Sequence, residues 1–168
     1  HNVAMERFDK TRMNIHSKEY DTLLKKEIDV WSAYASGKGS VSSFEEIKKT
    51  HSYQIYRKGT IELELSHIAK LQGPISVLEL GSADGWLSNE IATLDNVRDI
   101  TSIDISLEKN REKYTDKTIA LQGDLNKIEN IHFEQKYNCI ITHGTLHHLV
   151  DPKKTLMFCL DNLLLEGG

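Results

Sequence analysis

The chain has 168 residues, with 21 lysines and arginines against 25 aspartates and glutamates, so its formal net charge is −4. A hydrophobic fraction of 39% is typical of one globular domain and excludes disordered and collagen-like chains. Since charges of both signs are mixed throughout a slightly acidic chain, we expect no nucleic-acid partner.

Membrane and secretion signals are not recognised in the sequence. No apolar run approaches the length of about 20 residues that a membrane span needs, and no signal peptide is visible. Both cysteines, Cys139 and Cys159, lie in apolar stretches, as buried free thiols do in a reducing compartment. These features predict a cytoplasmic protein without a membrane span.

The first 72 residues carry the periodicity of helices. One apolar stripe with a spacing of three or four residues predicts a first helix that begins after Ser17: Tyr20, Leu24, Ile28, Trp31 and Ala35. A capping box at residues 43–46 predicts a second helix, and a third is expected over residues 60–72, before Gly73 and Pro74. We interpret residues 1–72 as an N-terminal helical lid or cap segment.

From residue 73 onward, short apolar runs alternate with helical segments. The runs, at residues 75–80, 99–103, 118–121 and 137–141, are expected to be strands. Helices are expected over residues 87–94, 107–114 and 125–131. Asp151 and Pro152 begin a last helix with a predicted buried face of Leu156, Leu160, Leu163 and Leu164. This alternation predicts an α/β core with a parallel sheet over residues 73–168.

A glycine-rich segment follows the first predicted strand, where parallel α/β sheets bind their ligands. Gly81 allows a sharp turn there, and Gly85 allows close approach at the start of the next helix. Counted from Gly81, the third and sixth positions hold Ala83 and Trp86, which does not match the glycines of a dinucleotide-binding loop. Glu79, two residues before Gly81, favours a cationic portion of a ligand over a diphosphate.

The next three predicted strands also end in residues suited to a nucleoside. Asp104, after the second strand, is placed where a carboxylate accepts two ribose hydroxyls. Asp124, after the third strand, is suited to an adenine amine, with Ile105 and Leu125 against the faces of the ring. His143 follows the fourth strand. The four strand ends together predict a nucleoside site.

The order of these segments resembles one known family. Residues 77–85, Val-Leu-Glu-Leu-Gly-Ser-Ala-Asp-Gly, resemble the first motif of the class I S-adenosylmethionine-dependent methyltransferases, although Ala83 replaces its middle glycine. Asp104 and residues 123–125 are similar to the family's ribose and adenine contacts. Residues 137–152 resemble its fourth motif, in the Leu-His-His-Leu-x-Asp-Pro variant common among members that methylate small molecules.

The resemblance implies a Rossmann-like fold and S-adenosylmethionine as cofactor, with S-adenosylhomocysteine as product. It implies methyl transfer to a small-molecule acceptor, through oxygen or nitrogen more often than through carbon. His143 is the predicted catalytic residue. The residues predicted to bind the cofactor are Glu79, Gly81, Ser82, Ala83, Gly85, Asp104, Ile105, Gly123, Asp124, Leu125 and Thr142.

The family's sheet has seven strands in the order 3-2-1-4-5-7-6, whereas this sequence supplies four predicted strands. We therefore expect a C-terminally truncated form of the fold, with the last strands missing. Residues 137–141 are apolar on both faces, as in a buried central strand, yet they are expected at an open edge. Either further residues after Gly168, or a second copy of the chain or an additional chain, are expected to cover that edge.

Several of these residues have simpler explanations. Asp104 and Asp124 are also suited to cap helices. His143 is either a general base near neutral pH or a residue that aligns the acceptor. His143 and His147 are four residues apart, as metal ligands on a helix can be, but no third ligand has suitable spacing, so no metal site is predicted. Arg57 is placed either at the carboxylate of the cofactor or in solvent.

Two functions of different classes remain open. One is a methyltransferase, and the other is a methyltransferase-like module that binds S-adenosylmethionine without catalysis. A nicotinamide-dependent oxidoreductase is disfavoured, because Trp86 occupies the place of the third glycine in the dinucleotide loop. Aromatic residues of the N-terminal helices, such as Trp31, belong either to the core or to an acceptor pocket.

Overall fold

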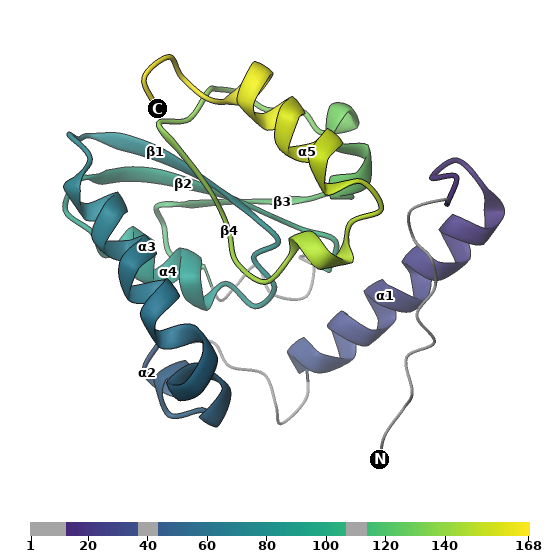
Figure 1. Cartoon of the computed structure of the whole chain (residues 1–168), viewed down its shortest axis with the longest axis horizontal. Helices are drawn as coiled ribbons and strands as arrows, with labels where there is room; N and C mark the ends of the chain where they lie inside the picture. The colour runs from purple at the N-terminus through teal and green to yellow at the C-terminus, as the bar shows by residue number, and fades with distance from the viewer. Residues whose placement is uncertain (1–12, 37–43, 107–113) are drawn as a thin grey trace.

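The computed structural model describes residues 13–36, 44–106 and 114–168 (Figure 1). Its helical elements are α1 (Lys18–Ser36), α2 (Phe44–Lys48), the π-helix η2 (Tyr53–Arg57), α3 (Lys58–Lys70), α4 (Trp86–Ala92), the 3₁₀-helices η5 (Leu125–Asn130) and η6 (Leu146–His148), α5 (Pro152–Phe158) and the π-helix η7 (Cys159–Leu163). The strands are β1 (Ile75–Leu80), β2 (Val97–Asp104), β3 (Thr118–Gln122) and β4 (Cys139–Thr142). Nearly all of the predicted helix over residues 107–114, and Ser43 of the capping box, lie outside the described residues.

The four strands form one parallel sheet in the order β3-β2-β1-β4. The predicted Rossmann-like α/β fold is confirmed by this order, in which β1 lies between β2 and β4. All six residues of β1 are buried. A strand in this position needs apolar residues on both of its faces, and this explains the dense apolar run at residues 75–80.

Helices cover both faces of the sheet (Figure 1), so the sheet divides the core in two. Successive residues of a strand point to opposite faces. Val77 and Ile100 therefore belong to one buried cluster, which includes Ile91 of α4. Leu78 belongs to the other cluster, which includes Ile128 of η5. The sheet is thus the middle layer of three.

The fourth strand differs from its prediction. β4 begins at Cys139, because Tyr137 instead forms an isolated parallel bridge with Leu164. Cys139 and Ile140 are only partly buried, which fits the expected place of this strand at an edge of the sheet although its residues are apolar on both faces. Among the described strands, β4 pairs with β1 alone, and a groove lined by residues of β4, α3 and η7 lies beside it.

The last helix also differs in its buried face. Asp151 caps α5 as predicted, and its carboxylate accepts a hydrogen bond from the Lys154 N–H at 2.9 Å. The buried residues of α5 and η7 are Thr155, Cys159 and Leu163. Leu160 is 54% exposed, so its predicted burial is wrong. The Thr155 hydroxyl donates to the carbonyl of Leu125 at 3.0 Å, so the inward face of α5 contacts η5.

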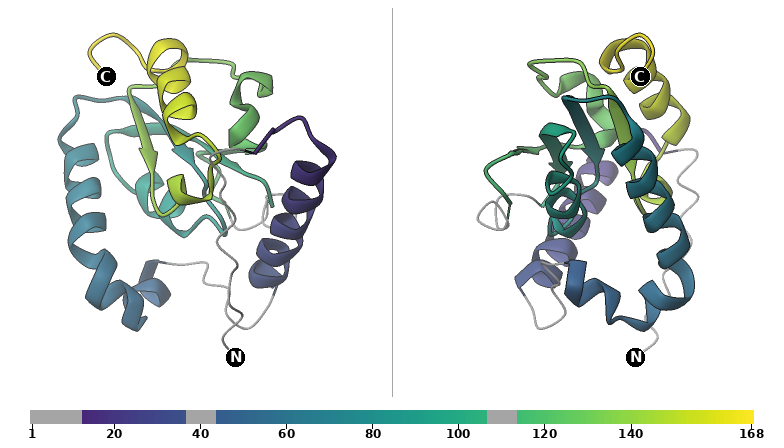
Figure 2. Two further views of the ribbon diagram at one scale, coloured as in Figure 1. Left: turned by 45° about the vertical axis from the view of Figure 1, so that its right-hand side comes forward. Right: turned by 90° about the vertical axis from the view of Figure 1, so that its left-hand side faces the viewer.

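The first helix begins where the sequence predicts, because Ser17 Oγ accepts a hydrogen bond from the Tyr20 N–H at 3.1 Å. Figures 1 and 2 show α1 and the α2–α3 segment on opposite sides of the strand ends. The Tyr20 hydroxyl donates to Asp124 at 2.7 Å, and Glu27 pairs with His148 at 2.9 Å. These contacts attach α1 to the loops after β3 and β4. The division of the chain into a lid and a core stays a prediction.

Two expectations from composition bear on the described residues. Cys139 and Cys159 are free thiols, and burial raises the pKa of both, that of Cys159 to about 11. Neither is therefore a reactive thiolate near neutral pH. Within the described ranges, no helix combines the length and the apolar character that crossing a membrane requires.

Ile100 tests the core on the face of the sheet covered by α4. Ile100 is 0% exposed, so Ile100→Ala removes packed methyl groups and leaves a cavity. We expect the free energy of unfolding, measured by urea denaturation, to fall by about 2–5 kcal/mol. Ile119→Ala is the matched control on β3, because Ile119 is 48% exposed, and its expected loss is below about 1 kcal/mol. Equal losses at the two positions would contradict the assigned core.

Candidate functional site

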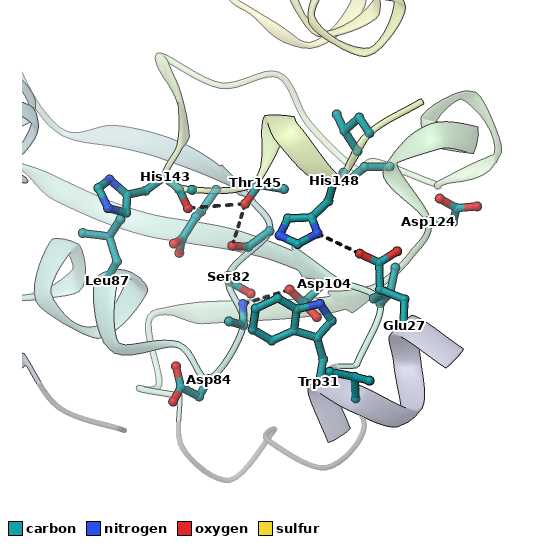
Figure 3. A pocket seen from close by; sticks show the side chains of 18 of the residues that line it. Glu27, Trp31, Ser82, Asp84, Leu87, Asp104, Asp124, His143, Thr145 and His148 are labelled. Atoms are coloured by element: carbon teal, nitrogen blue, oxygen red, sulfur yellow. Dashed lines mark hydrogen bonds and ion pairs between the residues drawn. The ribbon is translucent and has the colours of Figure 1, made fainter. Parts of the chain in front are cut away.

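A cavity of about 410 Å³ lies at the carboxyl end of the sheet (Figure 3). The loops that follow all four strands contribute to its wall, and α1 borders it from the side. Parallel strands bring their carboxyl ends to one edge, which is why segments distant in the sequence meet here. The volume lies within the range of about 300–1,000 Å³ that is usual for small-molecule sites.

The loop after β1 has an unusual backbone. Gly81 and Ala83 have φ values of 78° and 48°, in the left-handed region that disfavours side chains. A Cβ atom at Gly81 would collide with the side chain of Thr145, whose hydroxyl donates to the Gly81 carbonyl at 3.2 Å. Only glycine therefore fits at the point where the loops after β1 and β4 meet.

Asp104 ends β2 with its carboxylate at the cavity. Its Oδ2 accepts a hydrogen bond from the Ala83 N–H at 2.9 Å, and its Oδ1 accepts from the Ser106 N–H at 2.9 Å and from the Ser106 hydroxyl at 2.7 Å. A carboxylate offers about four acceptor sites, so one remains for a ligand hydroxyl. Accepting two hydroxyls, as predicted for a ribose, requires the Ser106 hydroxyl to turn away.

Asp124 performs the capping role that the sequence left open and also lines the cavity. Its Oδ1 accepts from the Asn126 N–H at 2.9 Å, which caps η5. Its Oδ2 accepts from the Tyr20 hydroxyl at 2.7 Å, and Asn126 Nδ2 donates to the same hydroxyl oxygen at 2.9 Å. Burial and the neighbouring Asp124 raise the pKa of Tyr20, so its hydroxyl stays a donor. Asp124 therefore connects α1 to the site.

Glu79 is a carboxyl group in the cavity wall that is 2% exposed. Ser88 Oγ donates to Glu79 Oε2, and the hydroxyls of Ser88 and Ser102 lie 2.6 Å apart. The pKa of Glu79 is raised to about 7, first by burial and then by the negative charges of Asp104 and Glu64, while the Ser88 hydrogen bond offsets part of the rise. A nearby cation would favour the ionised form, so this part of the cavity suits a positively charged group.

His143 lies directly after β4, and its side chain lines the cavity. Its Nδ1 atom is 3.2 Å from Oε2 of Glu64 on α3. The ring of Trp86 meets the His143 ring nearly at right angles, with centroids 6.1 Å apart. Contacts from α3 and α4 therefore hold this imidazole.

A second histidine contacts α1. His148 Nδ1 lies 2.9 Å from Oε1 of Glu27, and its ring meets that of Trp31 edge-on with centroids 5.5 Å apart (Figure 3). All three residues line the cavity. His148 is thus a packed histidine at the end of η6, and its partner is a side chain of α1.

Most of the predicted site residues meet in this one cavity. Its lining includes Glu79, Gly81, Ser82, Ala83, Asp104, Ile105, Asp124, Leu125 and His143, and also Arg57 of η2. Three predicted residues are outside the lining. Gly85 starts α4 beside Tyr114, Gly123 packs against Ile131, and the buried Thr142 hydroxyl has no hydrogen-bond partner among the described residues.

Two acidic residues near the cavity, Glu27 and Glu64, are not among the residues predicted from the sequence. Glu27 lies three residues after Leu24 and four before Trp31, so the helical stripe itself would have placed it near the cavity. Glu64 likewise lies three residues after the buried Ile61 and four before the buried Ile68, so periodicity places it on the inward face of α3 but does not identify His143 as its contact. In the described part of the chain, no three histidine, cysteine or acidic side chains are grouped to hold a metal.

A comparison with protein families decides the class of this chain. Residues 53–167, more than half of the chain, match the sequence model of a family described as "Methyltransferase domain". The chain belongs to this family. The matched region of this methyltransferase domain contains all four strands and the loops at their carboxyl ends. No curated protein matches the chain.

Solved structures share the fold of this methyltransferase domain. NodS, an N-methyltransferase of Bradyrhizobium japonicum in complex with S-adenosyl-L-homocysteine, has a TM-score of 0.58 at 13% identity, over 84% of this chain and 68% of its own. The Trypanosoma brucei PRMT1 enzyme–prozyme complex with AdoHcy has a TM-score of 0.52 at 21% identity, over 69% and 42%. The [4+2]-cyclase SpnF has a TM-score of 0.50 at 16% identity, over 69% and 46%. This chain thus spans slightly less than half of the PRMT1 and SpnF chains.

The raised pKa of Glu79 makes the stability of the domain depend on pH. Folded Glu79 holds its proton up to about pH 7, whereas an unperturbed glutamate releases it near 4.5. Between these values the folded state binds more protons than the unfolded state, so the free energy of unfolding falls as the pH rises. Glu79→Gln stays neutral and lacks this loss. The free energy of unfolding of Glu79→Gln, relative to that of wild type, should therefore rise by about 1–3 kcal/mol from pH 5 to pH 8.

Urea denaturation at several pH values measures this difference. Glu62→Gln on α3 is the control, because Glu62 is exposed and its removal should leave the pH dependence unchanged. A difference between wild type and Glu79→Gln that stays constant with pH would show that Glu79 does not titrate in this way.

Proposed function

We propose that this domain binds S-adenosylmethionine and transfers its methyl group to an oxygen or nitrogen atom of a small-molecule acceptor. The observation that carries this proposal is the convergence of four strand ends, with Gly81, Asp104, Asp124 and His143, on one cavity. The structures of NodS and PRMT1, which share the fold, contain S-adenosylhomocysteine. The S-adenosylhomocysteine in these two structures supports S-adenosylmethionine as the cofactor of this chain.

The lining of the cavity suits a cationic nucleoside. Asp104 has an acceptor site left for a ribose hydroxyl, and Asp124 offers a carboxylate to an adenine amine. Ile105 and Leu125 add apolar surface of the kind on which an aromatic ring packs. Glu79 and its acidic neighbours favour the positive charges of S-adenosylmethionine.

The residues of the chain then need to position an acceptor and remove its proton. When bound, S-adenosylmethionine supplies a methyl group on a sulfonium, which a nucleophile displaces in line. Alignment of the nucleophile accounts for much of such a rate enhancement. An oxygen or nitrogen nucleophile also loses a proton, and we propose that His143 in the cavity wall accepts it as a general base. A His143 that only aligns the acceptor is the alternative role.

A second function keeps the binding site without the transfer. SpnF shares the fold and is described as a [4+2]-cyclase, so the fold does not by itself decide the reaction. In this alternative the domain is a module that binds S-adenosylmethionine and transfers nothing. Cofactor binding without methyl transfer is its signature.

Asp104→Asn tests the cofactor site while keeping the shape of the side chain. The loss of the charge weakens a charged hydrogen bond worth about 1.5–3 kcal/mol, so we expect S-adenosylhomocysteine to bind about 10- to 100-fold more weakly in calorimetry. Asp99→Asn is the matched control on the same strand, because Asp99 binds Arg98 and Gln135 away from the cavity. Unchanged affinity in Asp104→Asn would remove Asp104 from the site.

Transfer of a labelled methyl group from S-adenosylmethionine tests the reaction and the acceptor class together. We expect label in the small-molecule fraction of a cell extract, and His143→Ala should slow its appearance about 100-fold with cofactor affinity unchanged. His132→Ala is the control, because His132 is an exposed histidine.

Each other outcome contradicts one part of the proposal. Label in the protein or nucleic-acid fraction would show that the acceptor is a macromolecule and not a small molecule. Cofactor binding with no label in any fraction would favour the non-catalytic module. Activity of His143→Ala within a few-fold of wild type would make His143 a structural residue.

A further inference from the structure

Glu64 of α3 contacts the imidazole of His143. Its Oε2 and Oε1 atoms lie 3.2 Å and 3.5 Å from His143 Nδ1. The side chains of His143 and Glu64 are only 12% and 23% exposed, so water competes weakly for this contact. A shielded charged hydrogen bond of this kind is stronger than one at the surface.

The position of Glu64 follows from the periodicity of α3. Ile61 and Ile68 are buried and anchor the helix to the core. Glu64 lies three residues after Ile61 and four before Ile68, on the helix face that packs inward. His143 is the first residue after β4, so packing of α3 on this side of the sheet brings the carboxylate to the imidazole.

A carboxylate at Nδ1 decides where the proton of a neutral imidazole resides. Ionised glutamate accepts hydrogen bonds and donates none, so Nδ1 must carry the hydrogen and Nε2 keeps its lone pair. The edge-to-face contact with Trp86 restrains the ring. Within residues 13–36, 44–106 and 114–168, no side chain other than Glu64 hydrogen-bonds this ring.

We propose that Glu64 is a positioning residue that holds His143 in the Nδ1-protonated tautomer, with Nε2 available as the proton acceptor. The use of Nε2 as a base rests on the proposed function, whereas the tautomer does not. In that step the proton moves from the acceptor's O–H or N–H to Nε2. The resulting imidazolium keeps its Nδ1–H donated to Glu64, whose negative charge stabilises it.

Nitrogen NMR of the full ¹⁵N-labelled chain tests the tautomer without any substrate. Long-range ¹H–¹⁵N correlations, recorded where the ring is neutral, distinguish a protonated Nδ1 from a protonated Nε2. We expect wild type to show the Nδ1–H form alone. Glu64→Gln should show a mixture of both forms, because an amide can either accept from the ring or donate to it.

The matched control is Glu62→Gln, which removes the same charge from an exposed position of the same helix and should leave the wild-type spectrum. Glu64→Gln is nearly isosteric, and a circular dichroism spectrum like that of wild type shows that it folds. In the methyl-transfer assay, Glu64→Gln should lower kcat about tenfold or more, with KM for S-adenosylmethionine unchanged.

Two results would overturn the inference: a wild-type ring protonated at Nε2, or a Glu64→Gln spectrum identical to that of wild type. Calorimetry with S-adenosylhomocysteine separates this failure from failure of the proposed function. If wild type shows the Nδ1–H form but does not bind S-adenosylhomocysteine, the role of Glu64 stands and the proposed cofactor is wrong.

Discussion

The meeting of two loops at the carboxyl ends of β1 and β4 is the constraint on which the site depends. Parallel pairing sets Leu80 beside Thr142, so both loops leave the sheet at the same place. The backbones approach closely enough that a Cβ atom at Gly81 would collide with Thr145. The left-handed turn that follows directs the Ala83 N–H to Asp104 at the end of β2. One close approach therefore arranges three strand ends around the cavity.

The cavity gathers acidic groups that oppose one another in the free protein. Burial and the charges of Asp104 and Glu64 disfavour ionisation of Glu79, and the hydroxyl of Ser88 offsets only part of this effect. Such an arrangement costs stability and is typical of functional sites, where a ligand supplies the missing positive charge. The charge pattern therefore links the pH dependence of folding to the proposed choice of a cationic cofactor.

The helices that precede β1 supply one carboxylate to each of two histidines. α3 provides Glu64 to His143, and α1 provides Glu27 to His148. Figure 2 shows that the two helices lie on opposite sides of the strand ends, so each reaches a different part of the loop after β4. These helices therefore border the cavity and also orient the imidazoles within it. A carboxylate on a neighbouring helix holds a histidine ring more firmly than solvent does.

Local signals in the sequence predict four strands in a parallel sheet and the residues that follow each strand, although β4 begins two residues later than predicted. Apolar runs and glycines between them are such signals, and they place Asp104 and Asp124 at strand ends without any knowledge of tertiary contacts. Packing in the folded structure makes Leu160 face solvent, because Thr155, Cys159 and Leu163, each four residues apart, form the buried face of α5 and the π-helix η7. It also decides which carboxylate meets which histidine. Glu64 and His143 are 79 residues apart, and no periodicity specifies a contact that only the packing of α3 against the sheet creates.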